Sequence, residues 1–165
     1  MTIEYLHLLQ QYLTGPGIPP IGMTETEILA LQTEFCANGK PFPKTLKEFL
    51  FLTGKQCAHF DSGVGSSPTY NAVQQKRLTI IANLPYSFSY PNIWSFGYQT
   101  DTESFYFIDL NEDSDDPDVY YTWLYEKQGR TGIPGECIEK TQYTFSGFIE
   151  ASINYYLATN DRFPH

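Results

Sequence analysis

The acidic side chains of this sequence are concentrated in one stretch. Nine of the 19 Asp and Glu residues lie between positions 101 and 126, an interval that contains no Lys or Arg. They are Asp101, Glu103, Asp109, Glu112, Asp113, Asp115, Asp116, Asp118 and Glu126. Carboxylates gathered on one hairpin create a local negative field that attracts and orients a basic partner. The stretch is therefore the first candidate binding site, and the partner it suits is a basic polypeptide.

Three other interpretations of the run from Asp109 to Asp118 stay open. Asp109, Asn111 and Asp113 match the opening of a calcium-binding EF-hand loop, although Ser114 stands where that loop needs Gly, and a Tyr replaces its bidentate Glu. A pair of acids could serve as general acid and base, but carboxylates in a solvated loop rarely acquire the unequal pKa values this requires. The run could also be a solvated turn without a role.

Other residue types that could do chemistry are poorly arranged. Cys57, His59 and Asp61 lie close together, yet a zinc site needs three or four ligands and no second ligand pair lies nearby. A Cys and His59 could form a nucleophile and its base, but no motif supports the pair. The Gly- and Ser-rich run 63–67 lacks the Lys-Ser/Thr ending of a phosphate loop. We expect no catalytic residue, no metal and no cofactor, and hence no enzyme.

Composition limits the partners. The chain has 165 residues and a net charge of -9, which disfavours nucleic acid and anionic membranes. Three widely spaced Cys residues make a disulfide framework improbable and fit a reducing compartment. No stretch reaches the roughly 18 apolar residues of a membrane span, and the start of the sequence lacks a basic, apolar leader. We expect a cytoplasmic protein that binds neither nucleic acid nor membrane; its oligomeric state stays open.

The first half of the sequence, before the acidic stretch, is expected to form mainly helices. Residues 1–23 suit a short accessory helix that Gly and Pro residues then break. Thr24 and Glu27 form a capping box before a helix over 25–37, and Thr45 and Glu48 repeat the pattern before a helix over 45–53. Gly54 stands where a left-handed residue commonly ends a helix. A loop over 55–69 and a third helix over 70–84 are expected to follow.

The hydrophobic period then changes from helical to alternating. Runs over 93–99, 104–110 and 119–126 alternate aromatic and β-branched residues, which predicts the strands of an antiparallel meander. A loop over 129–135 and a short strand over 137–143 follow, and an apolar stripe over 145–157 predicts a final helix. The fold class is α+β, a twisted antiparallel sheet flanked by helices. Trp94, Tyr98 and Tyr120 are candidate aromatic anchors for the partner wherever they face outward.

Several blocks of the sequence resemble the SUKH superfamily, specifically its SMI/KNR-type domains. The resemblance covers residues 24–157 in the right order, so 24–165 forms the SUKH-like domain and 1–23 the accessory segment. It rests on the helix 25–35, Phe42-Pro43-Lys44-Thr45-Leu46-Lys47-Glu48-Phe49-Leu50 with Gly54, Trp94-Ser95-Phe96-Gly97-Tyr98, Phe105-Tyr106-Phe107-Ile108-Asp109-Leu110, Pro117-Asp118-Val119-Tyr120 and Thr144-Phe145-Ser146-Gly147-Phe148-Ile149. The chain departs from the family where Thr100 to Ser104 replace a Gly-rich turn and where Phe42 replaces a Leu.

This resemblance implies an α+β fold without enzymatic activity. Bacterial members of the superfamily are mostly immunity proteins that bind and neutralise a cognate toxin of a polymorphic or contact-dependent system, often a basic nuclease. A basic toxin is also the partner that the acidic stretch independently favours. The alternative is an intracellular scaffold or regulator that binds proteins but has no toxin partner.

Overall fold

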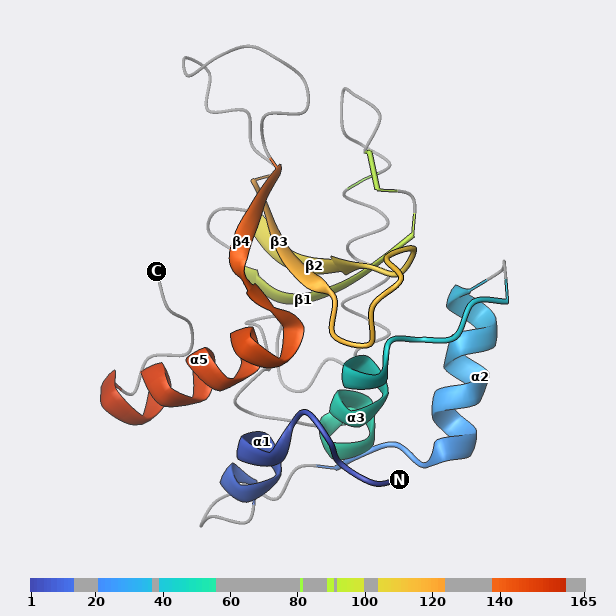
Figure 1. Ribbon diagram of the computed structural model, residues 1–165, viewed down its shortest axis with the longest axis horizontal. Helices are drawn as coiled ribbons and strands as arrows, with labels where there is room; N and C mark the ends of the chain where they lie inside the picture. Colours follow the sequence, from blue (N-terminus) through green and yellow to red (C-terminus); the bar gives the residue numbers. More distant parts are fainter. Residues whose placement is uncertain are drawn as a thin grey trace.

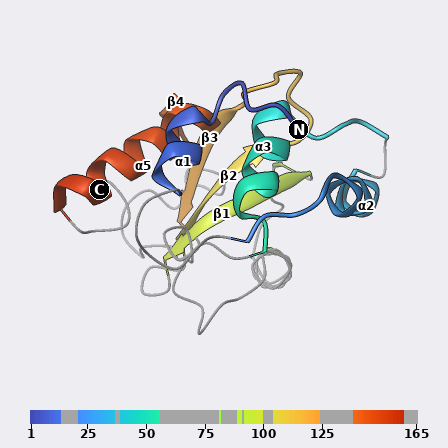
Figure 2. The same cartoon turned by 90° about the horizontal axis from the view of Figure 1, so that it is seen from below.

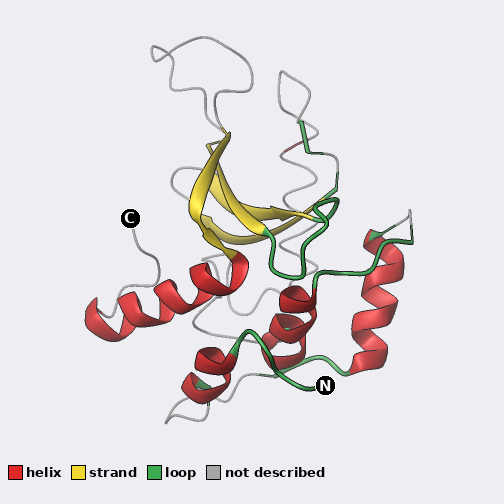
Figure 3. Cartoon of the chain, viewed as in Figure 1, coloured by secondary structure: helices red, strands yellow, loops and turns green. Residues whose placement is uncertain are grey.

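The computed structural model describes residues 1–13, 21–36, 39–55, 81, 89–90, 92–99, 104–123 and 138–159. They form a single α+β domain, in which a four-stranded sheet is preceded and followed by helices (Figures 1 and 3). The predicted fold class is confirmed. The expected loops over 55–69 and 129–135 and the expected helix over 70–84 lie almost wholly outside the described residues; position 81 is helical.

The sheet is an antiparallel meander with strand order β1-β2-β3-β4. Its strands are β1 (Ile93–Gln99), β2 (Ser104–Asp109), β3 (Asp118–Trp123) and β4 (Ile138–Thr144). Trp94 pairs with Ile108, and Ile108 pairs in turn with Val119, so these three side chains lie in one row across the sheet. The strands predicted from alternating aromatic residues are all present, and the last pair of strands contains a bulge.

Both faces of the sheet carry buried side chains. Trp94, Phe96, Ile108 and Val119 belong to the main core, which the helices complete from one side (Figure 2). Side chains one position along the strands point the other way, where Ile93, Phe105 and Phe107 form a second buried cluster. Strict alternation therefore places aromatic residues inside on both faces, because a strand turns successive side chains to opposite sides.

Four described helices contribute side chains to the main core. They are α1 (His7–Tyr12), α2 (Glu25–Phe35), α3 (Lys44–Thr53) and α5 (Phe145–Thr159). Of the stripe predicted over 145–157, Phe145, Phe148, Ile149, Ser152 and Ile153 are buried. Leu157, at its end, is exposed, so the buried stripe is shorter than predicted. No helix in the described part of the chain is long and apolar enough to cross a membrane.

The capping pattern is formed at one of its two predicted positions. Thr24 caps α2 with its hydroxyl, and the Glu27 carboxylate accepts a hydrogen bond of 2.8 Å from the Thr24 amide. At α3 the prediction is wrong: the helix begins at Lys44 after Pro43, and no side chain caps it. The prediction for Gly54 is also wrong, because its φ of -62° is right-handed.

Close packing accounts for the absence of a side chain at Gly54. A Cβ there would lie 2.4 Å from the carbonyl oxygen of Leu50 and 2.8 Å from Cγ of Met23. Both distances are shorter than any real Cβ contact. Among the described glycines, Gly39 adopts a left-handed conformation, with φ of 75°, in the connector that follows α2.

The N-terminal segment, residues 1–13, is packed into the core. Ile3, Leu6 and Leu9 belong to the same buried cluster as the sheet, and α1 packs on α5. The fully buried carboxylate of Glu48 accepts hydrogen bonds of 2.8 to 3.0 Å from the backbone amides of residues 4, 5 and 6. Glu48 thus fixes the backbone that leads into α1, because it supplies an acceptor for three consecutive amides.

Candidate partner-binding surface

The acid loop, Asp109–Asp118, joins β2 to β3 and lies over the first turn of α3 (Figure 1). Several of its carboxylates hold the loop's own backbone. Asp109 accepts a hydrogen bond of 2.9 Å from the Asn111 amide. Glu112 accepts hydrogen bonds of 3.3 Å from the Asp118 amide. Burial raises the pKa of Glu112, while the Asp118 amide opposes that rise. These acids shape the loop and are not freely presented to a partner.

Two further carboxylates tie the acid loop to neighbouring elements. Asp116 accepts hydrogen bonds from the amide and the hydroxyl of Ser146, at 2.8 and 2.6 Å, in the first turn of α5. It therefore caps that helix from a distant part of the chain, as an anion should at a helix N-terminus. Asp118 forms an ion pair with Lys140 on β4, and the hydrogen bond between them raises the pKa of Lys140.

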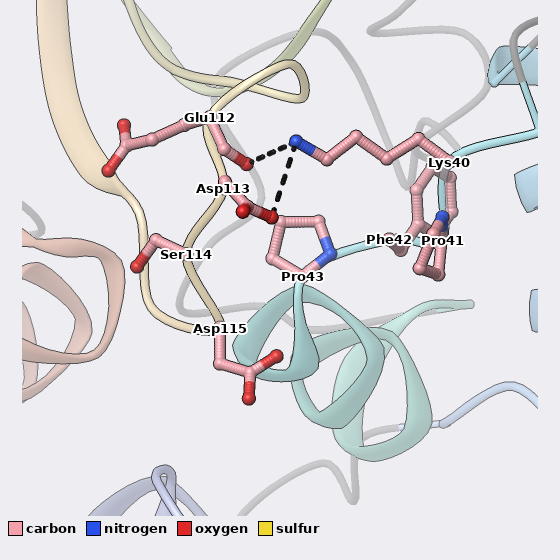
Figure 4. A pocket seen from close by; sticks show the side chains of 8 residues that line it. All are labelled: Lys40, Pro41, Phe42, Pro43, Glu112, Asp113, Ser114 and Asp115. Atoms are coloured by element: carbon pink, nitrogen blue, oxygen red, sulfur yellow. Dashed lines mark hydrogen bonds and ion pairs between the residues drawn. The ribbon is translucent and has the colours of Figure 1, made fainter.

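The remaining acids of the loop, Asp113 and Asp115, are exposed. The Asp113 carboxylate is fully open to solvent and lies 3.8 Å from Nζ of Lys40. The side chain of Asp115 points away from Lys40, beside the first turn of α3 (Figure 4). Its backbone carbonyl instead accepts hydrogen bonds from the amide and the hydroxyl of Thr45, at 3.0 and 2.9 Å. A fixed backbone therefore presents both carboxylates.

A hollow of about 280 Å³ separates the acid loop from the connector, residues 39–43. Its lining residues are Lys40, Pro41, Phe42, Pro43, Glu112, Asp113, Ser114 and Asp115. Lys40 crosses the hollow toward Glu112 and Asp113 (Figure 4). It donates hydrogen bonds of 2.8 and 2.9 Å to the carbonyl oxygens of Asn111 and Glu112. The carboxylate of Glu112 points out of the hollow (Figure 4). The hollow therefore lies between Pro and Phe residues of the connector and the acid loop, where Asp113 is the carboxylate beside Lys40.

Not all of the predicted site residues share this surface. Asp101 and Glu103 lie outside the described residues, as does the side chain of Tyr98. Asp109, Glu112, Asp113, Asp115, Asp116 and Asp118 come together in the acid loop as expected, but only Asp113 and Asp115 are exposed.

The structure overturns Trp94 as an outward-facing anchor. Its side chain is completely buried on the core face of β1, with edge-to-face contacts to Phe35 and Phe42 at centroid distances of 5.2 and 5.7 Å. Burying a large apolar side chain contributes about 1.5–3 kcal/mol, so Trp94 stays inside.

Tyr120 is half-buried on the opposite face of the sheet, stacked on Phe107 at 5.4 Å and tilted against Tyr90 at 5.1 Å. Burial raises the pKa of its phenol. Most of this ring is therefore engaged within the protein and is a poor candidate for the main anchor.

The residues that fix the acid loop were missed by sequence reasoning. Lys40, Thr45 and Ser146 lie 71, 70 and 30 positions from their partners in the loop. No local sequence pattern predicts contacts between residues so far apart in the chain. For the calcium interpretation, the described part of the chain contains no group of three or more His, Cys, Asp or Glu side chains placed to hold a metal ion.

Comparisons of this chain with protein-family models, with curated proteins and with solved structures found no match.

Proposed function

We propose that this chain is an immunity protein that binds and neutralises a basic polypeptide toxin through the acid loop. The observation that carries the proposal is that Asp113 and Asp115 are exposed on a loop that three other parts of the chain hold by hydrogen bonds. Lys40 holds the loop from the connector, Thr45 holds it from α3, and Ser146 holds it from α5. A loop fixed in this way loses little conformational entropy when a partner binds.

Charge supports the choice of partner. The chain carries a net charge of -9, and the exposed carboxylates of the loop add a local negative field. A nuclease toxin binds phosphates with Lys and Arg side chains. Carboxylates at the mouth of its cleft would take the place of those phosphates and exclude the substrate. The resemblance to SUKH-type domains points to the same class of partner.

The first test asks whether a toxin partner exists. A candidate toxin domain encoded beside this chain's gene is expressed in a bacterial host, with and without this chain. We expect growth arrest by the domain alone, rescue by co-expression, and a stable complex of the two purified proteins. Failure of both rescue and binding would reject the immunity function and leave a scaffold or regulator as the better description.

The second test asks whether the acid loop is the contact. The double variant Asp113→Asn/Asp115→Asn removes two exposed charges that make no described hydrogen bond within the loop. Exposed charge pairs contribute about 0.2–1 kcal/mol each, so the loss of affinity should be roughly 2- to 30-fold. Most of it should appear as slower association at low salt, because surface charges act mainly on the encounter.

A matched control removes the same amount of charge elsewhere. Glu34 on α2 and Glu150 on α5 are exposed, and Glu34→Gln/Glu150→Gln leaves the loop intact. We expect this variant to retain the association rate within about twofold, since distant exposed charges are largely screened. If the two double variants slow association equally, overall charge attracts the toxin and the acid loop is not its contact.

A further inference from the structure

The N-terminal segment places an aromatic side chain beside the acid loop. Tyr5 is partly exposed, and its ring lies 5.7 Å from Nζ of Lys44, the first residue of α3. Lys44 also forms an ion pair with Glu4. The next residue of α3, Thr45, holds the Asp115 carbonyl. One turn of helix α3 therefore contacts both Tyr5 and the exposed part of the acid loop.

Tyr5 and the acid loop both contact the first turn of α3, where Lys44 faces the Tyr5 ring and Thr45 binds the Asp115 carbonyl. The pKa of the Tyr5 phenol is raised, first by partial desolvation and then by the nearby carboxylates of Asp115 and Glu4. Lys44 and Thr45 are adjacent residues of α3, so a partner element that covers Asp115 over this turn lies beside the Tyr5 ring.

The position of Tyr5 is fixed from inside the protein. Its amide donates a hydrogen bond of 2.9 Å to the buried carboxylate of Glu48, and the flanking amides of residues 4 and 6 bind the same group. Ile3 and Leu6 are buried on either side of it. A Tyr on a backbone held this firmly combines a large contact area with a small entropy loss, which is typical of residues that dominate protein interfaces.

We propose that Tyr5 is the aromatic anchor of the partner-binding surface, and that the basic partner packs on Tyr5 while its cations meet Asp115 and Asp113. The proposal rests on the proposed function for its choice of partner. It moves the anchor from the sheet to the N-terminal segment, and it extends the surface from the hollow across the first turn of α3.

The affinity test compares two tyrosines of the N-terminal segment. Tyr5→Leu keeps an apolar group against the core but removes the aromatic ring. Tyr12→Leu is the control, because Tyr12 is also partly buried and contacts Tyr156 edge-to-face at 6.3 Å, on the side of the segment that faces α5. Binding is measured to the toxin domain from which this chain protects the host. We expect Tyr5→Leu to weaken this binding roughly 5- to 30-fold and Tyr12→Leu to change it less than twofold.

A second measurement uses the parent protein and needs no toxin. Hexa-arginine peptide is added at low salt, and the NMR signals of the Tyr5 ring and of the Asp113 and Asp115 amides are followed. We expect all three to shift together with one apparent affinity, while the amides of Glu34 and Glu150 shift less. Shifts of the loop amides without a shift of the Tyr5 ring overturn the proposal even if Tyr5→Leu fails to fold.

The outcomes separate this inference from the function it rests on. If no toxin binds the parent protein, the proposed function fails, and the peptide titration alone reports whether Tyr5 and the acid loop form one cation-binding surface. If the toxin binds and Asp113→Asn/Asp115→Asn weakens it while Tyr5→Leu does not, the function stands and Tyr5 is not its anchor.

Discussion

The starts of α2 and α3 carry the same pattern, a Thr followed three residues later by a Glu. At α2 the pair Thr24 and Glu27 closes a reciprocal capping box on the surface. At α3 the pair Thr45 and Glu48 lies inside the helix and is fully buried. Thr45 holds the acid loop and Glu48 holds the N-terminal segment. One local pattern thus has one local and one long-range outcome.

The difference between α2 and α3 shows under which conditions a capping pattern determines where a helix begins. α2 is packed on the body through few side chains, and Ile28 is its fully buried position, so local hydrogen bonds determine where it begins. Before α3, Pro43 fixes the backbone just outside the helix, and the carbonyl of Asp115 satisfies the free amide of Thr45. The two side chains are then available for tertiary contacts.

Of the substitutions that test this difference between the two Thr–Glu pairs, Glu48→Ala should cause the largest loss of stability. Glu48→Ala leaves three backbone amides of the N-terminal segment without their acceptor, and each buried donor left unsatisfied costs about 1–3 kcal/mol. We expect a loss of roughly 3 kcal/mol or more, which lowers the midpoint of thermal unfolding by roughly 6–12 °C for a chain of this size. Calorimetry or circular dichroism measures it.

Glu27→Ala is the matched control for this change, since it alters the same residue type in the same pattern. Glu27 is exposed, so its removal should lower the midpoint far less than Glu48→Ala does. Glu48→Gln should fall between the two, because an amide offers one acceptor oxygen where the carboxylate offers two. Equal effects of Glu27→Ala and Glu48→Ala would contradict the assignment of Glu48 as the support of the N-terminal segment.

A smaller effect should separate the two Thr residues. Thr24→Ala removes the cap of α2 and should cost about 1 kcal/mol. Thr45→Val keeps the buried shape but loses one hydrogen bond to Asp115, and should also cost about 1 kcal/mol. The two variants should lose similar amounts of unfolding free energy, but amide hydrogen exchange should distinguish them. Thr24→Ala should speed exchange at the Glu27 amide, and Thr45→Val should speed exchange at the amide of position 45. The same exchange pattern in both variants would argue against separate roles.

Much of the fold follows from local sequence patterns. Alternation of aromatic residues predicts β1, β2 and β3, and the apolar stripe from Phe145 predicts α5, because each pattern reports the period of its own backbone. Alternation does not say which face is inside. Trp94 and Ile93 are neighbours in β1 and both are buried, on opposite faces, so an outward anchor could not be identified from the strand pattern.

The candidate site was only partly predictable. The concentration of acids in the loop is visible in the sequence, since it needs only counting. Whether a given acid is exposed depends on partners far along the chain, such as Ser146 for Asp116. The supporting contacts of Lys40, Thr45 and Glu48 span 42 to 72 residues and depend on how the helices pack against the sheet. Tertiary packing decides these contacts, and no local pattern encodes them.

The smallest expected effect concerns the exposed pair, Thr24 and Glu27, and the pKa of the Glu27 carboxyl. Glu27 is held by Lys55 at 2.6 Å and by the amide and hydroxyl of Thr24. The hydrogen bond from Lys55, followed by those from Thr24, lowers the pKa of Glu27 from 4.5 to about 2. Because the folded pKa lies below the unfolded one, the carboxylate stabilises the fold above pH 4.5, and this contribution is lost as the pH falls toward 2.

Lys55→Gln removes the largest cause of that shift and leaves the Thr24 contacts. We expect the pKa of Glu27, measured by NMR titration of its side-chain carboxyl, to rise from about 2 toward 4.5 without reaching it. The acid-induced exposure of the Glu27 amide should begin at a correspondingly higher pH. Salt should shift the pKa of the parent protein in the same direction, because an exposed ion pair is screened. A pKa that stays near 2 in Lys55→Gln would show that the capping box alone holds the charge, and that α2 begins without help from the chain beyond α3.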